Sequence, residues 1–94
     1  MGTKNNPGNF DCYDKLDPDE PMFVLMGRDP QAGYIVRCWA EDRVRKIAAD
    51  RDGGVISSVQ YELEMNKVLE AYKCADDMDA WCRHMGKEPR FRGD

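Results

Sequence analysis

Hydrophobic residues along the chain form two long periodic segments, and they are sparse in the stretch before them. Asp29-Pro30 introduces the first segment, in which apolar residues recur at helical steps until the adjacent glycines of Asp52-Gly53-Gly54 predict a stop. Ser57 or Ser58 can cap the second segment, whose apolar stripe continues to Gly86. The stripe positions are Ala32, Ile35, Val36, Trp39, Ala40, Val44, Ile47 and Ala48 in the first segment, and Tyr61, Met65, Val68, Leu69, Tyr72, Ala75, Met78, Cys82 and Met85 in the second.

The second of these helices is expected to be the longer one. At roughly 28 residues it would span about 40 Å, so we expect it either to bend near Asp76-Asp77 or to project beyond its neighbour. Its apolar stripe would also permit a homodimer, in which the long helix pairs with its copy in another chain.

A short apolar run, residues 22–28, precedes both segments and is ambiguous. Asp17-Pro18-Asp19-Glu20-Pro21 has the composition of a helix start, and Met and Leu favour helix, whereas Val24 alone is β-branched. We therefore predict an all-α fold, a small three-helix bundle with a long C-terminal helix. The alternative is an α+β fold in which residues 22–28 form a short strand.

The chain is long enough for one core only, because a domain of this size buries about 60–65% of its unfolded surface. Residues 1–9, mostly Asn, Gly and Pro, are expected to be a flexible arm, and residues 10–86 a single helical domain. Residues 87–94 are expected to be a frayed, basic tail. Its Arg92-Gly93-Asp94 matches an integrin-binding tripeptide, which is too short a motif to indicate that function.

Charge limits the classes of partner. Fourteen Lys and Arg against eighteen Asp and Glu give a net charge of −4, the wrong sign for binding nucleic-acid duplexes. Basic residues are interspersed with the acidic ones, which argues against a nucleic-acid mimic. The longest apolar run, residues 22–26, cannot span a bilayer, and no signal peptide is visible, so we expect a cytoplasmic protein with reduced cysteines and no membrane partner.

No convincing catalytic or metal site is visible in the sequence. His84, the single histidine, is expected to be a solvated residue at a helix end rather than a general base. Cys74 and Cys82 lie about 12 Å apart along a helix, too far to share one zinc ion unaided. Gly53-Gly54 lacks the surroundings of a phosphate-binding loop. We therefore expect no enzyme activity, no cofactor and no bound metal.

Two surfaces are candidates for binding a partner protein. The acidic group between residues 11 and 20 loosely matches a calcium loop but lacks its glycine turn and terminal Glu, so a docking face for a basic partner is the better interpretation. The end of the long helix offers a second surface if it overhangs. The candidate residues are Asp11, Asp14, Asp17, Asp19 and Glu20 in the first, and Met78, Trp81 and Met85 in the second.

Several stretches in the first half of the chain resemble a group of short proteins encoded by bacteriophages and prophages. They are Asn9-Phe10-Asp11-Cys12-Tyr13, Pro18-Asp19-Glu20-Pro21-Met22-Phe23-Val24-Leu25, Arg28-Asp29-Pro30 and Val36-Arg37-Cys38-Trp39-Ala40. The group usually has Ala-Pro where this chain has Ala32-Gly33, and it has no assigned activity to carry over. The resemblance implies a phage accessory protein that works in the cytoplasm of a bacterial host.

Two functions are compatible with these features. The first is a non-catalytic protein that binds and inhibits a host protein, as anti-defence proteins of the anti-CRISPR kind do. The alternative is an oligomer that sequesters a small ligand such as a nucleotide through stacked aromatic and arginine side chains. Candidates for that role are Tyr13, Tyr34, Arg37, Trp39 and Arg43, although Trp39 lies on the apolar stripe and is expected in the core.

Overall fold

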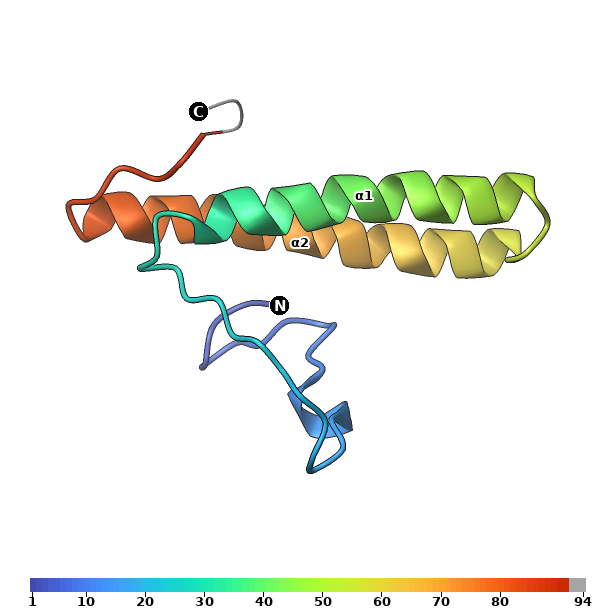
Figure 1. The fold of residues 1–94 in the computed structure, drawn as a ribbon, viewed down its shortest axis with the longest axis horizontal. Helices are drawn as coiled ribbons and strands as arrows, with labels where there is room; N and C mark the ends of the chain where they lie inside the picture. Colours follow the sequence, from blue (N-terminus) through green and yellow to red (C-terminus); the bar gives the residue numbers. More distant parts are fainter. Residues whose placement is uncertain (92–94) are drawn as a thin grey trace.

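A computed structural model describes residues 1–91 and shows an antiparallel pair of helices with an N-terminal segment along one side (Figure 1). The helices are α1 (Ala32–Asp52) and α2 (Ser58–His84), preceded by the one-turn 3-10 helix η1 (Tyr13–Lys15). No strand occurs in the described residues, which confirms the all-α prediction. Within residues 1–91, neither long helix is apolar enough over a sufficient length to cross a membrane.

Local sequence explains where both helices begin and end. Ser57 is the N-cap of α2, and its Oγ accepts a hydrogen bond of 3.1 Å from the Gln60 amide. Gly54 follows α1 and Gly86 follows α2, with φ of 72° and 78° that favour glycine. At α2 the amides of Gly86 and Lys87 turn back to bond Arg83 and Cys82 carbonyls, and α1 ends with the same pattern.

The core lies between the two helices and is made largely of small residues. Ala32 and Ala40 on α1 and Ala71 and Ala75 on α2 are fully buried, beside the larger buried side chain of Val68. A Cβ on Gly33 would collide with the Asp79 carboxylate and approach the Ala75 carbonyl oxygen to 3.1 Å. Small residues therefore allow the helix backbones to approach closely. Partly buried side chains flank this core: Val36, Val44, Ile56, Tyr61, Met65 and Tyr72.

The prediction of a three-helix bundle is wrong in one element. Residues 22–28 form neither the expected helix nor the alternative strand, and the described part of the chain contains two α-helices. A seven-residue segment between Pro21 and Pro30 is too short to be a stable helix without a packed face. The acidic start signal at Asp17 instead forms a turn, closed by a 3.0 Å bond from the Glu20 amide to the Asp17 carbonyl.

The core prediction fails on one side of α1 for a related reason. Ile35 and Trp39 are each 41% exposed, although both follow the helical apolar stripe. Since α2 covers one face of α1 and no third helix of the described chain packs on the other side, these two side chains remain partly open to solvent. Ala40 and Ile47, which face α2, are buried as expected.

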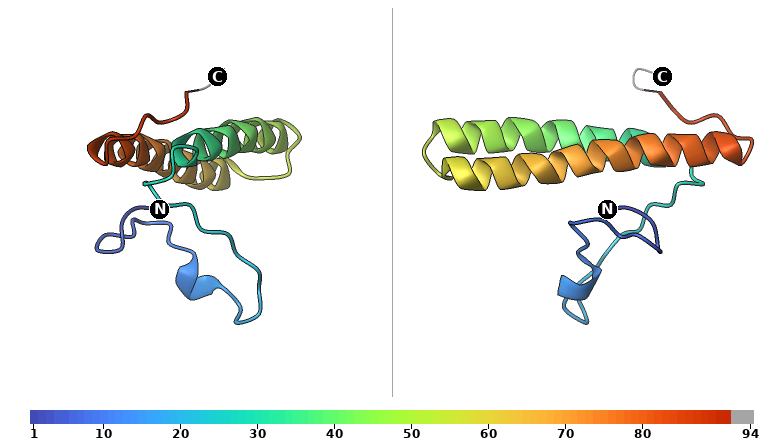
Figure 2. Two further views of the ribbon diagram at one scale, coloured as in Figure 1. Left: turned by 60° about the vertical axis from the view of Figure 1, so that its left-hand side comes forward. Right: turned by 180° about the vertical axis from the view of Figure 1, so that it is seen from behind.

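The start of the chain lies against the middle of α2 (Figure 2). The carboxylate of Glu70 accepts hydrogen bonds from the amides of Asn9 and Phe10, at 3.1 and 3.2 Å. The Met1 ammonium also pairs with this carboxylate, at 3.1 Å. Residues 11–26 then leave the helices as a loop that projects away from them (Figure 1).

The C-terminal end of α2 extends past the start of α1, as the length of the helix predicted (Figure 1). The helix is continuous through Asp76 and Asp77. After Gly86 the chain turns back, and the Arg90 amide donates a 2.9 Å hydrogen bond to the Pro30 carbonyl. Arg92-Gly93-Asp94, the match to an integrin-binding motif, lies outside the described residues.

Candidate interaction surface

The projecting loop, residues 11–26, carries all five acidic residues of the first predicted surface. Two of them form hydrogen bonds within the loop. Asp11 Oδ1 accepts a hydrogen bond of 3.1 Å from the Tyr13 amide, and Glu20 Oε1 accepts one of 3.2 Å from the Asp17 amide. Lys15 is the single basic residue of the loop. Asp14, Asp17, Asp19 and Glu20 are exposed, so the tip of the loop presents a negative surface.

The second half of the loop, residues 22–26, presents apolar side chains to solvent. Phe23 is 85% exposed and Val24 is 61% exposed, while Leu25 is partly buried. Met22 and Met26 are more than half exposed. Scattered exposed apolar residues are ordinary, but consecutive ones are typical of a binding surface.

The backbone of residues 22–26 is as open as its side chains. The segment runs without a bend or turn (Figure 1), and within the described chain none of its five amides donates a hydrogen bond. One carbonyl, that of Met26, accepts a bond from the Asp29 amide at 3.0 Å. The segment therefore has free donors and acceptors beside exposed apolar side chains.

The second predicted surface lies elsewhere, at the end of α2. Trp81 and Met85 are 53% and 51% exposed, and Met78 is partly buried. Gly27 lies so close that a Cβ on it would be 3.4 Å from the Trp81 Cβ. The chain thus covers part of this surface itself. The acidic residues and the α2 end are not brought together, since the tip of the loop points away from the helices (Figure 2).

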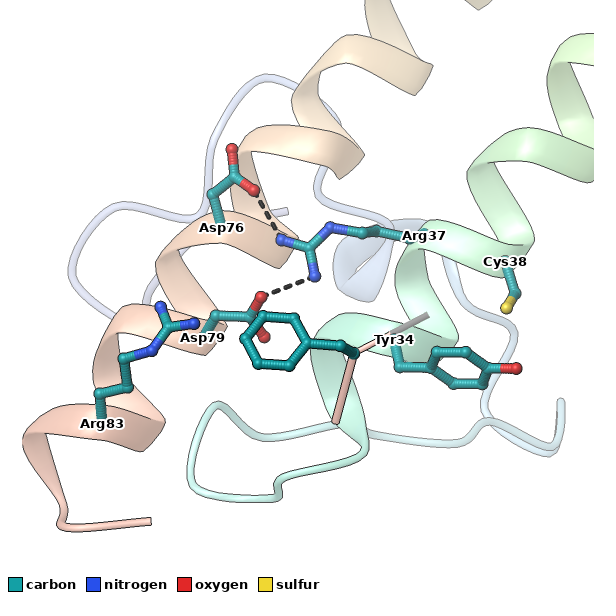
Figure 3. Close-up of a pocket in the computed structure, with 7 residues that line it drawn as sticks. Tyr34, Arg37, Cys38, Asp76, Asp79 and Arg83 are labelled. Atoms are coloured by element: carbon teal, nitrogen blue, oxygen red, sulfur yellow. Dashed lines mark hydrogen bonds and ion pairs between the residues drawn. The ribbon is translucent and has the colours of Figure 1, made fainter. Parts of the chain in front are cut away.

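A shallow pocket of about 340 Å³ opens between α1 and α2. At its centre Arg37 forms two ion pairs of 2.6 Å, one with the exposed Asp76 and one with the buried Asp79 (Figure 3). Burial alone would lower the pKa of Arg37, but the two carboxylates outweigh it and raise that pKa, which keeps the guanidinium charged. The arginine is thus held by its own carboxylates. The other lining residues are Tyr34, Cys38, Arg83 and Phe91.

Of the aromatic and arginine side chains considered for nucleotide binding, Tyr34 and Arg37 line the same pocket, and the other three lie outside it. The Arg90 guanidinium lies over the Tyr34 ring, with its Cζ 3.9 Å from the ring centroid. The Arg43 guanidinium lies over the Trp39 ring, with its Cζ 5.4 Å from the ring centroid. Tyr13 belongs to η1, in the projecting loop. Tyr13, Trp39 and Arg43 therefore do not join Tyr34 and Arg37 in one stacking site within a single chain.

The cysteines differ in accessibility. Cys12 and Cys38 are exposed, Cys74 is partly buried and Cys82 is buried, and all four are free thiols. Burial raises the pKa of the Cys74 thiol. His84 is exposed, with its ring 5.4 Å from that of Trp81. Among the described residues, no three His, Cys, Asp or Glu side chains form a group that could hold a metal ion.

Comparison of the chain with protein families, with curated proteins and with solved structures found no match. Sequence reasoning missed the exposure of Phe23 and Val24, because it assigned residues 22–28 to a packed element. Pro21 and Pro30 were a signal that no long helix runs through this segment, since the residue before each proline disfavours helical backbone.

Proposed function

We propose that this protein is a non-catalytic accessory protein of phage origin that binds a host protein and inhibits it, as an anti-defence protein does. The observation that supports binding is the projecting loop, which exposes Met22, Phe23 and Val24 to solvent. Keeping such side chains in water costs free energy, about 25 cal/mol per Å² of apolar surface. Covering them with a partner recovers that free energy.

The electrostatic character of the loop supports a basic partner. Five carboxylates lie within residues 11–20, shortly before the apolar segment, against one lysine. Charges of this kind increase the rate of association with a positively charged surface more than the final affinity. The phage origin and the cytoplasm of a bacterial host come from the sequence resemblance.

The arrangement of the rest of the molecule is consistent with a scaffold for this loop. The closest ionic contacts, those of Arg37, hold α1 against α2, and Glu70 fixes the base of the loop through the Asn9 and Phe10 amides. A binding segment on a fixed base loses less entropy on association than a free peptide.

Light scattering of the purified chain, alone and after addition of nuclease-treated bacterial lysate fractions, tests the proposal. We expect one host protein to co-elute in a fixed stoichiometric ratio and to be identifiable by mass spectrometry. A chain that elutes at the same mass in every fraction, with no stoichiometric partner, would contradict the proposal.

A further inference from the structure

The backbone of residues 22–26 indicates how the loop binds, whereas exposed side chains alone do not distinguish one binding mode from another. The segment contains no bend or turn, and in an extended conformation its side chains would alternate between two sides, with Met22, Val24 and Met26 opposite Phe23 and Leu25. Within the described chain its amides have no hydrogen-bond acceptors. Such a backbone can pair with a strand without breaking any hydrogen bond of its own amides.

We propose that residues 22–26 bind by adding as a strand to an open β-sheet edge of the partner protein, beside apolar pockets and basic side chains. This inference rests on the proposed function. In strand addition, main-chain hydrogen bonds supply much of the affinity, and pockets for alternate side chains supply specificity. The segment offers amides without acceptors and exposed apolar side chains, and the carboxylates of Asp19 and Glu20 lie just before it.

A partner sheet fits these features better than a second copy of this chain. Two copies pairing through residues 22–26 would form an isolated two-stranded ribbon, because the described residues contain no other strand to extend it. Such ribbons are marginally stable in water, whereas an existing sheet already has a buried face.

One edge of the strand is more open than the other. The Met26 carbonyl already accepts the Asp29 amide, so the edge formed by residues 22, 24 and 26 is partly used. The amides and carbonyls of Phe23 and Leu25 have no partner in the described chain. Phe23 and Leu25 therefore provide the edge that bonds to the partner sheet.

A proline scan of the full-length chain tests this mode, with the host protein captured by the wild-type chain as the probe. Proline removes the amide donor, and an alanine variant at the same position is the matched control for the side chain. We expect Phe23→Pro and Leu25→Pro to weaken binding about tenfold or more beyond their alanine controls. Met22→Pro and Val24→Pro should stay within about threefold of theirs. Circular dichroism checks that the helices, which lie outside the segment, are intact.

The outcomes separate the binding mode from the proposed function. Losses at Phe23 and Leu25 alone support strand addition through the assigned edge, and losses at Met22 and Val24 alone overturn that edge assignment. Equal losses at every position indicate a helix formed on binding and overturn strand addition. Binding that depends on side chains without any proline effect also overturns it, and leaves the proposed function in place. A wild-type chain that captures no stoichiometric partner overturns both. A chain that is dimeric alone, and loses the dimer in the same alternating pattern, would replace the partner sheet by a second copy.

Discussion

Arg37 on α1 and Asp79 on α2 form the most enclosed ion pair between the helices, with 2.6 Å between Nη1 and Oδ2. The Asp79 side chain is 9% exposed, and it lies beside Gly33 near the N-terminus of α1. A carboxylate at that position also interacts favourably with the helix dipole. This contact fixes how α1 and α2 meet at the end of the hairpin where the projecting loop joins.

Asp79→Ala should destabilise the protein measurably. It would leave the partly buried Arg37 with the exposed Asp76 alone, and we expect a loss of about 1–3 kcal/mol in the free energy of unfolding. Asp76→Ala is the matched control, because its side chain is 75% exposed, and should cost no more than about 1 kcal/mol. Urea denaturation of the three proteins measures both effects. Equal costs for the two variants would contradict the assigned geometry.

The cap of α2 distinguishes two adjacent serines. Ser57 Oγ accepts the Gln60 amide, whereas Ser58 is the first residue of the helix. Ser57→Ala should therefore cost about 1 kcal/mol, and Ser58→Ala should stay within about 0.5 kcal/mol of wild type. Thermal or urea unfolding of the two variants provides the comparison. A larger loss for Ser58→Ala would place the cap one residue later.

Stability should depend on pH through Glu70. Burial alone would raise the pKa of this carboxyl, but hydrogen bonds from the Met1 ammonium and from the Asn9 and Phe10 amides outweigh it and lower the pKa. A carboxyl with a lowered pKa in the folded state stabilises the fold above its unfolded pKa, about 4.3, and this stabilisation is lost as pH falls through the folded value.

Glu70→Gln is the variant that isolates this effect. The wild type should be more stable than Glu70→Gln at pH 7, and the difference should shrink as the pH falls from about 5 toward 3. Urea unfolding of both proteins across this pH range measures the difference in their free energies of unfolding. The other carboxyl groups are the same in both proteins, so their contributions largely cancel in this difference. A difference that is constant with pH would show that Glu70 does not titrate with folding.

The thiols should react in two classes. Cys12 and Cys38 are exposed and should react rapidly with a thiol reagent at pH 8, while Cys82 is buried and should react slowly. Cys74 belongs to the slow class, because partial burial raises its pKa and reduces its thiolate fraction. Timed labelling followed by peptide mass spectrometry assigns each site. Rapid labelling of Cys82 in the folded protein would contradict the packing of α2.

Much of the helical structure follows from local signals. The double glycine after Asp52, the serine cap and the apolar stripe place α1 and α2 to within a few residues. The segment 22–28 was misassigned because its acidic, proline-containing start resembles that of a helix, whereas the stability of so short a helix depends on a packing surface that local sequence does not reveal.

The polar contacts were harder to predict for a similar reason. Asp79 falls on the same stripe as Tyr72, Ala75 and Cys82, and an acid there could have been recognised as a buried partner for an arginine on α1. Its pairing with Arg37 is a contact across 42 positions, which depends on the register of two helices. The candidate contact residues were chosen by charge and stripe, so Phe23 was absent from them.

The most direct measurement for the central claim, that the projecting loop binds the partner, is the affinity of loop variants for the captured host protein. Phe23→Asp places a charge where the apolar contact is expected, and Val59→Asp is the matched control on α2, since Val59 is similarly exposed at 79%. We predict that Phe23→Asp weakens binding at least about tenfold, equivalent to about 1.4 kcal/mol, while Val59→Asp binds as the wild type does. Wild-type affinity for Phe23→Asp, with the helices intact by circular dichroism, would contradict the account.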